Sequence, residues 1–279
     1  MTRNEIMLEA TDGSRVRLHS HGGQVLSWRT ADGTEQLFLS TSADFTRGAA
    51  IRGGIPVIFP QFAALGPLPK HGFARNRDWQ PDPVTDPACR VLTLVDDAST
   101  HALWPHRFLL RLRVRIAPWT LEVRLEVTNR DPAPCPFTAA LHTYLRVAEL
   151  QRTRILGLEA RPYIDAAAGG IRRPGAAAPV TFPGEVDRVY ADVASPVRVV
   201  DATGTRVITQ EGFPDIVVWN PGAERAADLA DLEPGGAGRM VCVEAAAAAH
   251  PVHLASGATW VGSQSIHAAP QTSQPGEHR

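Results

Sequence analysis

The chain has 279 residues, 44% of them hydrophobic, so it can bury a substantial core as one large β domain or as two ordinary domains. Its 28 Lys and Arg residues nearly balance its 29 Asp and Glu residues, so the chain has no excess of positive charge for binding nucleic acid or an anionic membrane. No apolar stretch approaches the roughly 20 residues that span a bilayer, and the N-terminus has no apolar run suited to a signal peptide.

Alternating polar and apolar residues dominate the chain from its N-terminal part onward. This period of two is typical of half-buried strands, and turn residues such as Pro, Asp and Asn separate the alternating segments. The segment at 198–210 is expected to be a hairpin that turns at Thr203-Gly204. The strand segments that we expect, in chain order, are residues 14–20, 23–30, 89–97, 106–118, 119–129, 198–210, 215–220, 240–246 and 259–268.

The segment at 106–118 shows the alternation most clearly. Arginines at positions 111, 113 and 115 fall on one face of the expected strand, and apolar residues fall on the other. The next strand carries Glu122 and Glu126 on the same face as Arg124, so its carboxylates can pair with arginines across the two strands. We interpret the arginines as a solvated strand face rather than as a groove for nucleic acid.

Convincing helical patterns are scarce. The Ala-rich stretches 166–168 and 245–249 have helical propensity, but the second follows an apolar strand directly and ends at His250-Pro251. We therefore interpret this second stretch as a strand end followed by a loop. The chain is expected to be all-β, with one sandwich domain of antiparallel strands over residues 1–268. Residues 269–279 are polar and are expected to form a flexible tail.

The cysteines indicate a reducing compartment. Cys89, Cys135 and Cys242 are odd in number and far apart, and they form neither a CxxC pair nor a disulfide framework. We therefore expect a cytoplasmic protein without a membrane or nucleic-acid partner. No oligomeric state is predicted.

The loop at residues 52–76, RGGIPVIFPQFAALGPLPKHGFARN, combines stiffness with positive charge. Adjacent glycines permit close backbone approach or unusual dihedral angles, and four prolines stiffen the rest of the loop. Arg52, Lys70, His71 and Arg75 suit the capture of a small anion, because Arg forms two-pronged contacts with phosphate or carboxylate and Lys supplies a compact charge. The residues alone also fit a structural loop with surface charges.

Two further segments carry candidate acid and base groups. In FTAALHTYLRV, the strand period places His142, Tyr144 and Arg146 on one face, where a histidine is either structural or useful near neutral pH. In MVCVEAA, Glu244 shares a face with Met240, and a carboxylate beside apolar neighbours needs a partner or a task.

Metal and nucleotide motifs are not found. The sequence contains no HExxH, no paired cysteines, no GxGxxG, no Walker loop and no GxSxG elbow. His19-Ser20-His21 has no third ligand in view, so we interpret it as a polar turn and expect neither a metal nor a cofactor. Asp187 and Asp215 are each ordinary by themselves.

Taken together, seven segments resemble the glucose-6-phosphate 1-epimerases of the aldose-1-epimerase group. They occur in the family's order over residues 5–268: AIRGGIPVIFPQF, LPKHGFARNRDW, LHTYLRV, DRVY, VVWNP, MVCVEAA and GATWVGSQSI. The resemblance implies a galactose-mutarotase-like β-supersandwich of large antiparallel sheets with a sugar cleft across one face. It also implies cofactor-free interconversion of the α and β anomers of a hexose 6-phosphate, a small-molecule sugar phosphate.

The resemblance also implies roles for particular residues. Arg52 and Arg75 match arginines that bind the phosphorylated substrate, and Asp187 matches an aspartate that contacts the sugar. His142 and Glu244 match the active-site histidine and glutamate. Lys70, beside His71, stands where the family usually has Gln, so a donor and acceptor is replaced by a donor-only cation.

Mutarotation needs one acid and one base on opposite sides of the sugar. We expect Glu244 to be the base and His142 the acid, with the roles exchanged on ring closure. A carboxylate, Asp187 or Glu244, is expected to favour the protonated imidazole. Two alternatives are an aldose 1-epimerase acting on free sugars and a non-catalytic sugar-phosphate-binding module on the same fold. A β-sandwich without a ligand would leave the set of motifs unexplained.

Overall fold

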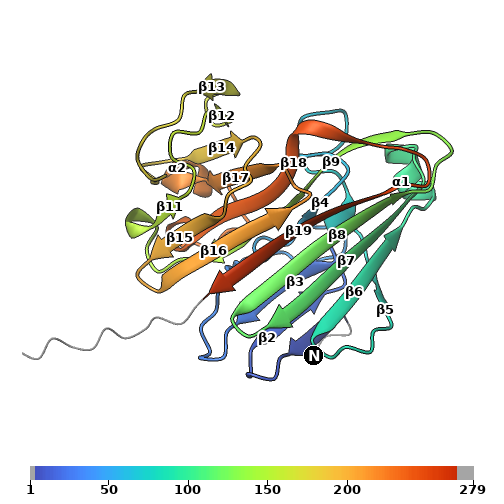
Figure 1. The fold of residues 1–279 in the computed structure, drawn as a ribbon, viewed down its shortest axis with the longest axis horizontal. Coiled ribbons are helices and arrows are strands. Elements are labelled where there is room, and N and C mark those ends of the chain that lie inside the picture. The colour runs from blue at the N-terminus through green and yellow to red at the C-terminus, as the bar shows by residue number, and fades with distance from the viewer. Residues whose placement is uncertain (1–3, 269–279) are drawn as a thin grey trace, which may run out of the picture.

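The computed structural model describes residues 4–268 and consists almost entirely of antiparallel strands (Figure 1). Within these residues the strands form two eight-stranded sheets, here called sheet I and sheet II, and a three-stranded N-terminal sheet. The expected all-β class is thereby confirmed. The predicted tail at 269–279 lies outside the described residues, and the prediction of a single domain stays a prediction.

Sheet I carries the candidate site residues Asp187 and Glu244 within its strands, and His142 lies in the connection between two of its strands. Its strand order is β13-β12-β14-β17-β18-β9-β4, with β10 also paired to β18. Its strands are β4 (Val57–Ile58), β9 (Cys135–Leu141), β10 (Tyr144–Arg146), β12 (Tyr163–Asp165), β13 (Ile171–Arg173), β14 (Val186–Tyr190), β17 (Asp215–Asn220) and β18 (Met240–Leu254).

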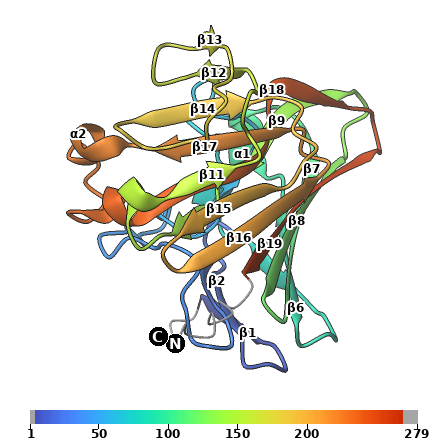
Figure 2. The same cartoon turned by 60° about the vertical axis from the view of Figure 1, so that its left-hand side comes forward.

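Sheet II packs against sheet I and supplies the other half of the sandwich. Its order is β11-β15-β16-β19-β8-β7-β6-β5. Its strands are β5 (Gln80–Asp82), β6 (Cys89–Val95), β7 (Phe108–Ala117), β8 (Thr120–Asn129), β11 (Arg154–Leu156), β15 (Val197–Asp201), β16 (Gly204–Glu211) and β19 (Thr259–Ala268). The small sheet is β1 (Glu5–Glu9), β2 (Arg15–His19) and β3 (Gln24–Arg29). In two views the small sheet lies at the opposite end of the molecule from hairpin β12–β13 (Figure 2).

Helices are short in the described residues, as the sequence predicts. They are α1 (Ala98–Leu103), α2 (Gly222–Ala226) and the 3-10 turns Ala74–Asn76, Leu150–Arg152 and Gly236–Arg239. The carboxylate of Asp97 begins α1 by accepting from the backbone N–H groups of Ser99 and Thr100. Among residues 4–268 no helix has both the length and the apolar character needed to cross a membrane.

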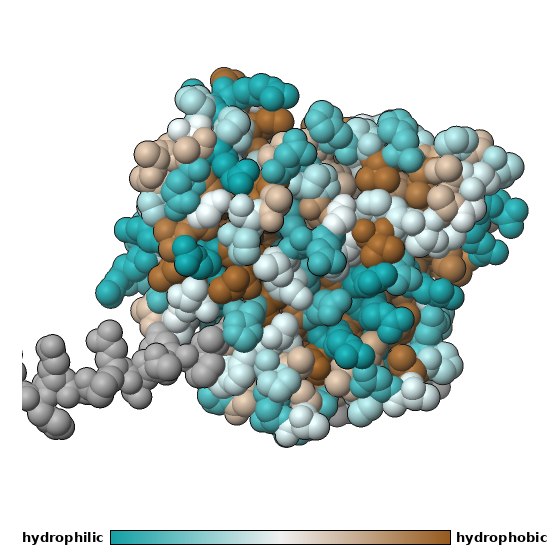
Figure 3. Space-filling view, viewed as in Figure 1, coloured by the Kyte–Doolittle hydropathy of each residue, from teal (hydrophilic) through white to brown (hydrophobic). Residues whose placement is uncertain are grey.

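Strand β7 confirms the predicted separation of faces. Its apolar residues are buried in alternation, whereas Arg111, Arg113 and Arg115 are exposed. The register places Arg111 opposite Glu126 on β8, as expected for a charged outer face. The ion pair of Arg111 nevertheless runs to Asp82 on β5, with 3.9 Å between nitrogen and oxygen. On the face shown in Figure 3, hydrophilic residues predominate and hydrophobic residues are scattered between them.

Neither Ala-rich stretch forms the helix that its composition favours. Residues 166–168 form the turn between β12 and β13. Residues 245–249 lie inside β18, which continues to Leu254, so the prediction of a strand end plus loop is wrong. At the irregularity in β18, the Asp215 carboxylate accepts from the N–H groups of Ala248 and Ala249, both at 2.8 Å. Tertiary pairing with β9 therefore overrides the low strand propensity of alanine.

Candidate active site

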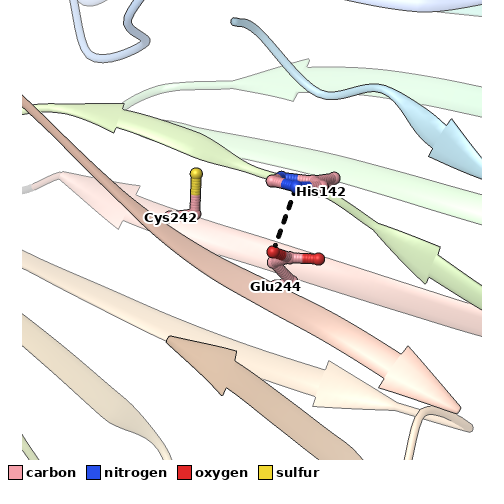
Figure 4. Close-up of side chains that lie close together, drawn as sticks. All are labelled: His142, Cys242 and Glu244. Atoms are coloured by element: carbon pink, nitrogen blue, oxygen red, sulfur yellow. Dashed lines mark ion pairs between the residues drawn. The ribbon is translucent and has the colours of Figure 1, made fainter. Parts of the chain in front are cut away.

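The sheet register brings His142 and Glu244 together. Tyr144 lies opposite Cys242, and the Val243 N–H donates to the Thr143 carbonyl, so His142 comes to lie beside Glu244. The His142 Nε2 atom is 3.3 Å from the Glu244 Oε1 atom. Figure 4 shows the imidazole ring, from the connection between β9 and β10, facing the carboxylate on β18, with the Cys242 thiol beside them.

This pair is buried and has unused hydrogen-bonding capacity. The His142 side chain is 8% exposed and that of Glu244 is 2% exposed. The His142 Nδ1 atom and the Glu244 Oε2 atom are buried without a hydrogen-bond partner among the described residues. Leaving such atoms unpaired is costly, so the geometry favours a polar ligand that would complete their hydrogen bonds.

Burial and neighbouring charges disfavour the ionised forms of both groups. Burial, with His71, Arg75 and Arg52, lowers the pKa of His142 well below its ordinary value. Burial, with Asp187, raises the pKa of Glu244 well above its ordinary value, against the opposing effect of Arg75 and Lys70. These pKa shifts favour a neutral imidazole beside a protonated carboxyl group. The expectation that a carboxylate favours protonated His142 concerns the working state and stays a prediction; in the structure, burial and the cations have the larger effect on its pKa.

Two aromatic rings fix the orientation of the His142 ring. The Tyr144 ring stacks on it, with centroids 4.7 Å apart and an interplanar angle of 9°. The Trp219 ring on β17 meets it edge-on at 5.8 Å. Contacts of this kind restrict side-chain rotation and so present the imidazole in one orientation.

Arg52 reaches the site from the Gly53-Gly54 turn. Both glycines have positive φ, and a Cβ atom would lie 2.5 Å from the Phe38 carbonyl oxygen at Gly53 and 2.0 Å from the Val25 carbonyl oxygen at Gly54. The close backbone approach predicted from the paired glycines is thereby confirmed.

The Arg52 guanidinium has two partners in the site. It donates to the Tyr144 hydroxyl at 3.0 Å and to the Asp231 carboxylate at 3.0 Å. Its Nε atom is buried and has no partner among the described residues. Arg52 is therefore held in place but retains a donor for a further ligand.

His71 is a neutral group in this site. Its ring lies 5.5 Å from the His142 ring, measured between centroids. Its Nδ1 atom accepts from the Ala63 N–H at 3.3 Å, so Nε2 carries the ring proton. Burial, with Arg75, Lys70 and Arg52, lowers the pKa of His71 to about 2. It can therefore donate a hydrogen bond over the whole working pH range without adding charge.

Gln61 stabilises the loop that carries His71. Its side-chain amide donates to the Ala63 and Leu68 carbonyl groups, and its side-chain oxygen accepts from the Leu68 N–H at 2.9 Å. The local fold of this proline-rich loop thus depends on one buried amide, which positions the lysine and histidine later in the loop.

Arg75 and Lys70 complete a group of cations around the pair. One Arg75 nitrogen donates to the Lys70 carbonyl at 3.2 Å, and the Arg75 Nε atom is buried without a partner among the described residues. Burial lowers the pKa of Arg75, and Arg52 lowers it further. Partial burial likewise lowers the pKa of Lys70, and Arg225 adds to this effect. The cations are close enough to repel one another, which favours an anionic ligand.

Asp187 lies on the same face of sheet I. It is opposite Trp219, which is in turn opposite Cys242. Burial raises the pKa of Asp187, against the opposing effect of Lys70. The fold thus gathers the predicted site residues into one region, although Asp187 acts on Glu244 only through charge.

The comparisons with known proteins agree with this arrangement. A family model described as aldose 1-epimerase matches residues 4–267. The chain belongs to the aldose 1-epimerase family. The expected enzyme class, an epimerase, is thereby confirmed.

Several relatives of this family member carry the provisional name glucose-6-phosphate 1-epimerase. One from Cenchrus ciliaris is 37% identical over 96% of this chain and 85% of its own length. One from Escherichia coli is 33% identical over 84% of this chain and 83% of its own length. A crystal structure of a provisionally assigned mutarotase from Salmonella typhimurium is 30% identical, with a TM-score of 0.84 over 92% of this chain and 88% of that chain.

A more distant solved structure supports the fold alone. A galactose mutarotase related enzyme from Lactobacillus acidophilus has a TM-score of 0.78 at 15% identity, over 97% of this chain and 99% of that chain. The galactose-mutarotase-like architecture that the sequence resemblance implies is therefore confirmed.

Two residues of this epimerase site could not be assigned from the sequence. The sequence places Tyr144 only on the same strand face as His142, and this strand alternation is the signal that could have identified Tyr144 as a site residue. Asp231 carries no such signal, because it lies in a loop whose approach to Arg52 depends on tertiary structure. The loop is tied to the chain near Thr41, whose N–H donates to the Glu233 carboxylate.

The site of this epimerase also contains possible metal donors. Within residues 4–268, His142, Cys242 and Glu244 are the one group of such donors whose ligand atoms all lie within 4.8 Å of one another. Burial raises the pKa of the Cys242 thiol well above its ordinary value, and metal binding requires the thiolate. The surrounding cations oppose a metal ion as well, so the donor set fits proton chemistry better.

Other features lie apart from this site. His21 is buried and bonded to the Asp78 carboxylate at 3.0 Å and to the Ala49 carbonyl at 2.8 Å, so it is structural rather than part of an open turn. A groove of about 510 Å³, lined by Arg17, Glu35 and other residues, includes none of the predicted site residues.

Proposed function

We propose that this member of the aldose 1-epimerase family interconverts the α and β anomers of a hexose 6-phosphate, with D-glucose 6-phosphate as the favoured substrate and without a cofactor. One observation carries the proposal: a buried imidazole and carboxyl group 3.3 Å apart lie next to a group of cations that the protein neutralises only in part. The names of the relatives from Cenchrus ciliaris and Escherichia coli support the phosphorylated substrate.

The reaction requires proton transfer to and from two oxygens of the sugar. Glu244, as carboxylate, removes the proton of the anomeric hydroxyl while His142, as imidazolium, protonates the ring oxygen. The bond between C1 and the ring oxygen breaks, and an open-chain aldehyde forms. After rotation about the C1–C2 bond the C5 hydroxyl closes the ring on the other face of the aldehyde, with His142 taking back the hydroxyl proton and Glu244 returning its proton to the aldehyde oxygen. No redox step and no nucleotide is involved.

The remaining residues bind and orient the substrate. Arg52, Arg75 and Lys70 hold the phosphate, since the Nε atoms of both arginines are buried donors without an acceptor in the part of the chain that the structure describes. His71 donates from Nε2 to a sugar hydroxyl, and Asp187 accepts from another. Lys70, as a donor-only group, strengthens the hold on phosphate instead of bridging two hydroxyls.

Anomer exchange tests the catalytic roles directly. Pure α-glucose 6-phosphate is dissolved with and without protein, and its equilibration is followed by polarimetry or NMR. His142→Ala and Glu244→Gln are each expected to lower the turnover number by about 10²–10⁴-fold, because each removes a positioned proton-transfer group. Normal turnover by either folded variant would contradict the assignment. Binding of the sugar phosphate without acceleration by the wild-type protein would favour the non-catalytic binding module.

A comparison of substrates tests the phosphate role. Arg75→Ala is expected to lower kcat/KM for glucose 6-phosphate by roughly 10- to 100-fold, the range for losing a charged hydrogen bond, with a smaller effect on glucose. Arg198→Ala is the matched control, because Arg198 is exposed on β15 in sheet II. Equal losses for both sugars in Arg75→Ala would contradict the phosphate role and favour an epimerase of free sugars.

A further inference from the structure

The cation group and the acid–base pair are connected by direct contacts. Arg52 donates to the Tyr144 hydroxyl at 3.0 Å, and the Tyr144 ring stacks on the His142 ring at 4.7 Å. His142 in turn lies 3.3 Å from Glu244. An anion bound at Arg52 would therefore be separated from the imidazole by a single aromatic side chain.

The cations are only partly neutralised by the protein. Among the described residues, Asp231 is the one carboxylate that forms an ion pair with this group, through Arg52. The Nε atoms of Arg52 and Arg75 are both buried and have no hydrogen-bond partner within residues 4–268. A site with unpaired buried donors and excess positive charge favours the binding of a dianion.

We propose that a dianion bound by Arg52, Arg75 and Lys70 activates the proton chemistry of His142 and Glu244, so that the substrate's phosphate is an activator as well as a binding handle. This inference rests on the function proposed above. It differs from a simple binding role because the phosphate would raise the reactivity of a sugar to which it is not covalently attached.

The electrostatic reason lies in the groups that face the pair. His142 is approached by His71 and Arg75 from one loop, by Arg52 from another, and by Glu244 from β18. Arg75 and Arg52 oppose a positive charge on the imidazole. A dianion that neutralises them removes this opposition, so His142 becomes able to hold the proton that it must donate to the ring oxygen.

The same anion acts on the carboxyl group. Arg75 and Lys70 favour the ionised form of Glu244, whereas Asp187 from β14 disfavours it. Neutralising Arg75 and Lys70 therefore raises the proton affinity of Glu244 too. Anion binding is therefore expected to be coupled to proton uptake by those molecules whose pair has lost its proton. A pair that holds one proton has one acid and one base, which is the state that ring opening needs.

Separating the substrate into two pieces tests the proposal. D-Xylose is glucose without the arm that carries the phosphate, and phosphite is a dianion small enough to replace that arm. Exchange between the xylose anomers is measured by NMR at rising phosphite concentration, and the protein-free rate at each concentration is subtracted because phosphite itself catalyses mutarotation. We expect kcat/KM for xylose to rise at least ten-fold at saturating phosphite, and chloride at equal ionic strength to have no such effect.

Two variants locate the activation. Arg75→Ala is expected to lower the activation ratio, which is the xylose rate with phosphite divided by the rate without it. Arg198→Ala is expected to leave the ratio unchanged, because Arg198 is an exposed arginine on β15 outside the site. If phosphite inhibits or leaves the wild-type rate unchanged while glucose 6-phosphate is still turned over, the activation is refuted and the proposed function stands. If glucose 6-phosphate is not turned over either, the proposed function fails first.

Proton uptake gives an independent measurement that does not require turnover. Sulfate is a dianion that does not titrate near neutral pH, so any proton taken up on its binding comes to the protein. Calorimetry of sulfate binding in two buffers with different ionisation enthalpies is expected to show net proton uptake at pH 7. Sulfate binding with no proton uptake, or with proton release, would overturn the proposed coupling.

Discussion

At the scale of single residues, Glu244 combines chemical use with a cost to stability. Its side chain is 2% exposed, its Oε2 atom has no partner among the described residues, and burial raises its pKa well above 4.5. A glutamate in solution ionises near that value, so folding holds the group in the protonated form over a range where the unfolded chain loses the proton. The site thereby stores a proton at the expense of stability.

This conflict gives a pH-dependent prediction for Glu244→Gln. Above pH 4.5 the unfolded wild-type chain binds fewer protons at this position than the folded protein, so the free energy of unfolding of the wild type falls as pH rises. Glutamine does not titrate. We expect the stability of Glu244→Gln relative to wild type to increase with pH, by up to about 1.4 kcal/mol per pH unit, until the folded glutamate itself ionises.

Urea unfolding between pH 4 and pH 8 measures this difference, and anomer exchange on the same samples measures the loss of activity. A stability difference that stays constant or shrinks over the range would show that Glu244 is already ionised in the folded protein. The stored-proton account of the pair would then be wrong.

At the scale of elements, one buried contact joins the two large sheets directly beneath the site. The Thr143 hydroxyl donates to the Gln264 side-chain oxygen on β19 at 2.5 Å, and the Gln264 amide donates to the Val243 carbonyl on β18 at 3.1 Å. Thr143 comes directly after His142 in the chain and points to the opposite side. The interior contact thus fixes the backbone from which the imidazole projects.

A double-mutant cycle tests this connection. Thr143→Val leaves a buried amide oxygen without a donor and is expected to lower the free energy of unfolding by about 1–3 kcal/mol. The double variant Thr143→Val/Gln264→Leu is expected to lose less free energy of unfolding than the two single variants lose in sum, because both partners are then apolar. Chemical denaturation measures the cycle, and kcat for anomer exchange is expected to fall in Thr143→Val. Additive losses would show that the two side chains do not interact.

The element scale also shows what strand periodicity can and cannot predict. Alternation is sufficient for β7, whose two faces differ in polarity, and for the shared face of His142 and Tyr144. It is insufficient for residues 245–249, because alanine has weak strand propensity and its pairing with β9 depends on residues far away in the chain. The lowered pKa of His142 could not be predicted from the sequence either, since burial by sheet packing is not visible in a local pattern.

At the scale of the whole molecule, the site is assembled from segments that lie far apart in the chain. The 52–75 region, the β9–β10 connection, β14 and β18 each supply part of it, and their meeting depends on the order of strands in sheet I. The family resemblance could anticipate this meeting for five of the predicted residues, whereas Lys70 departs from the pattern. It could not anticipate Asp231, whose loop carries no motif and reaches Arg52 only in the folded protein.

Ligand-dependent stability measures binding separately from chemistry at this scale. A ligand that binds only the folded state stabilises it by about 2.7 kcal/mol at 100 times its Kd, which corresponds to a rise in Tm of roughly 5–10 °C for a chain of this size. We expect glucose 6-phosphate to raise the Tm of wild type and of His142→Ala, since the phosphate-binding cations are intact in both. Glucose at equal concentration is expected to have a much smaller effect, because it makes no contact with those cations.

Arg75→Ala is expected to lose most of the rise in Tm that glucose 6-phosphate causes, whereas Arg198→Ala retains it. A Tm rise in His142→Ala together with its loss of anomer exchange would separate binding from chemistry in one folded protein, whereas equal Tm rises with glucose and glucose 6-phosphate would contradict a phosphate-selective site.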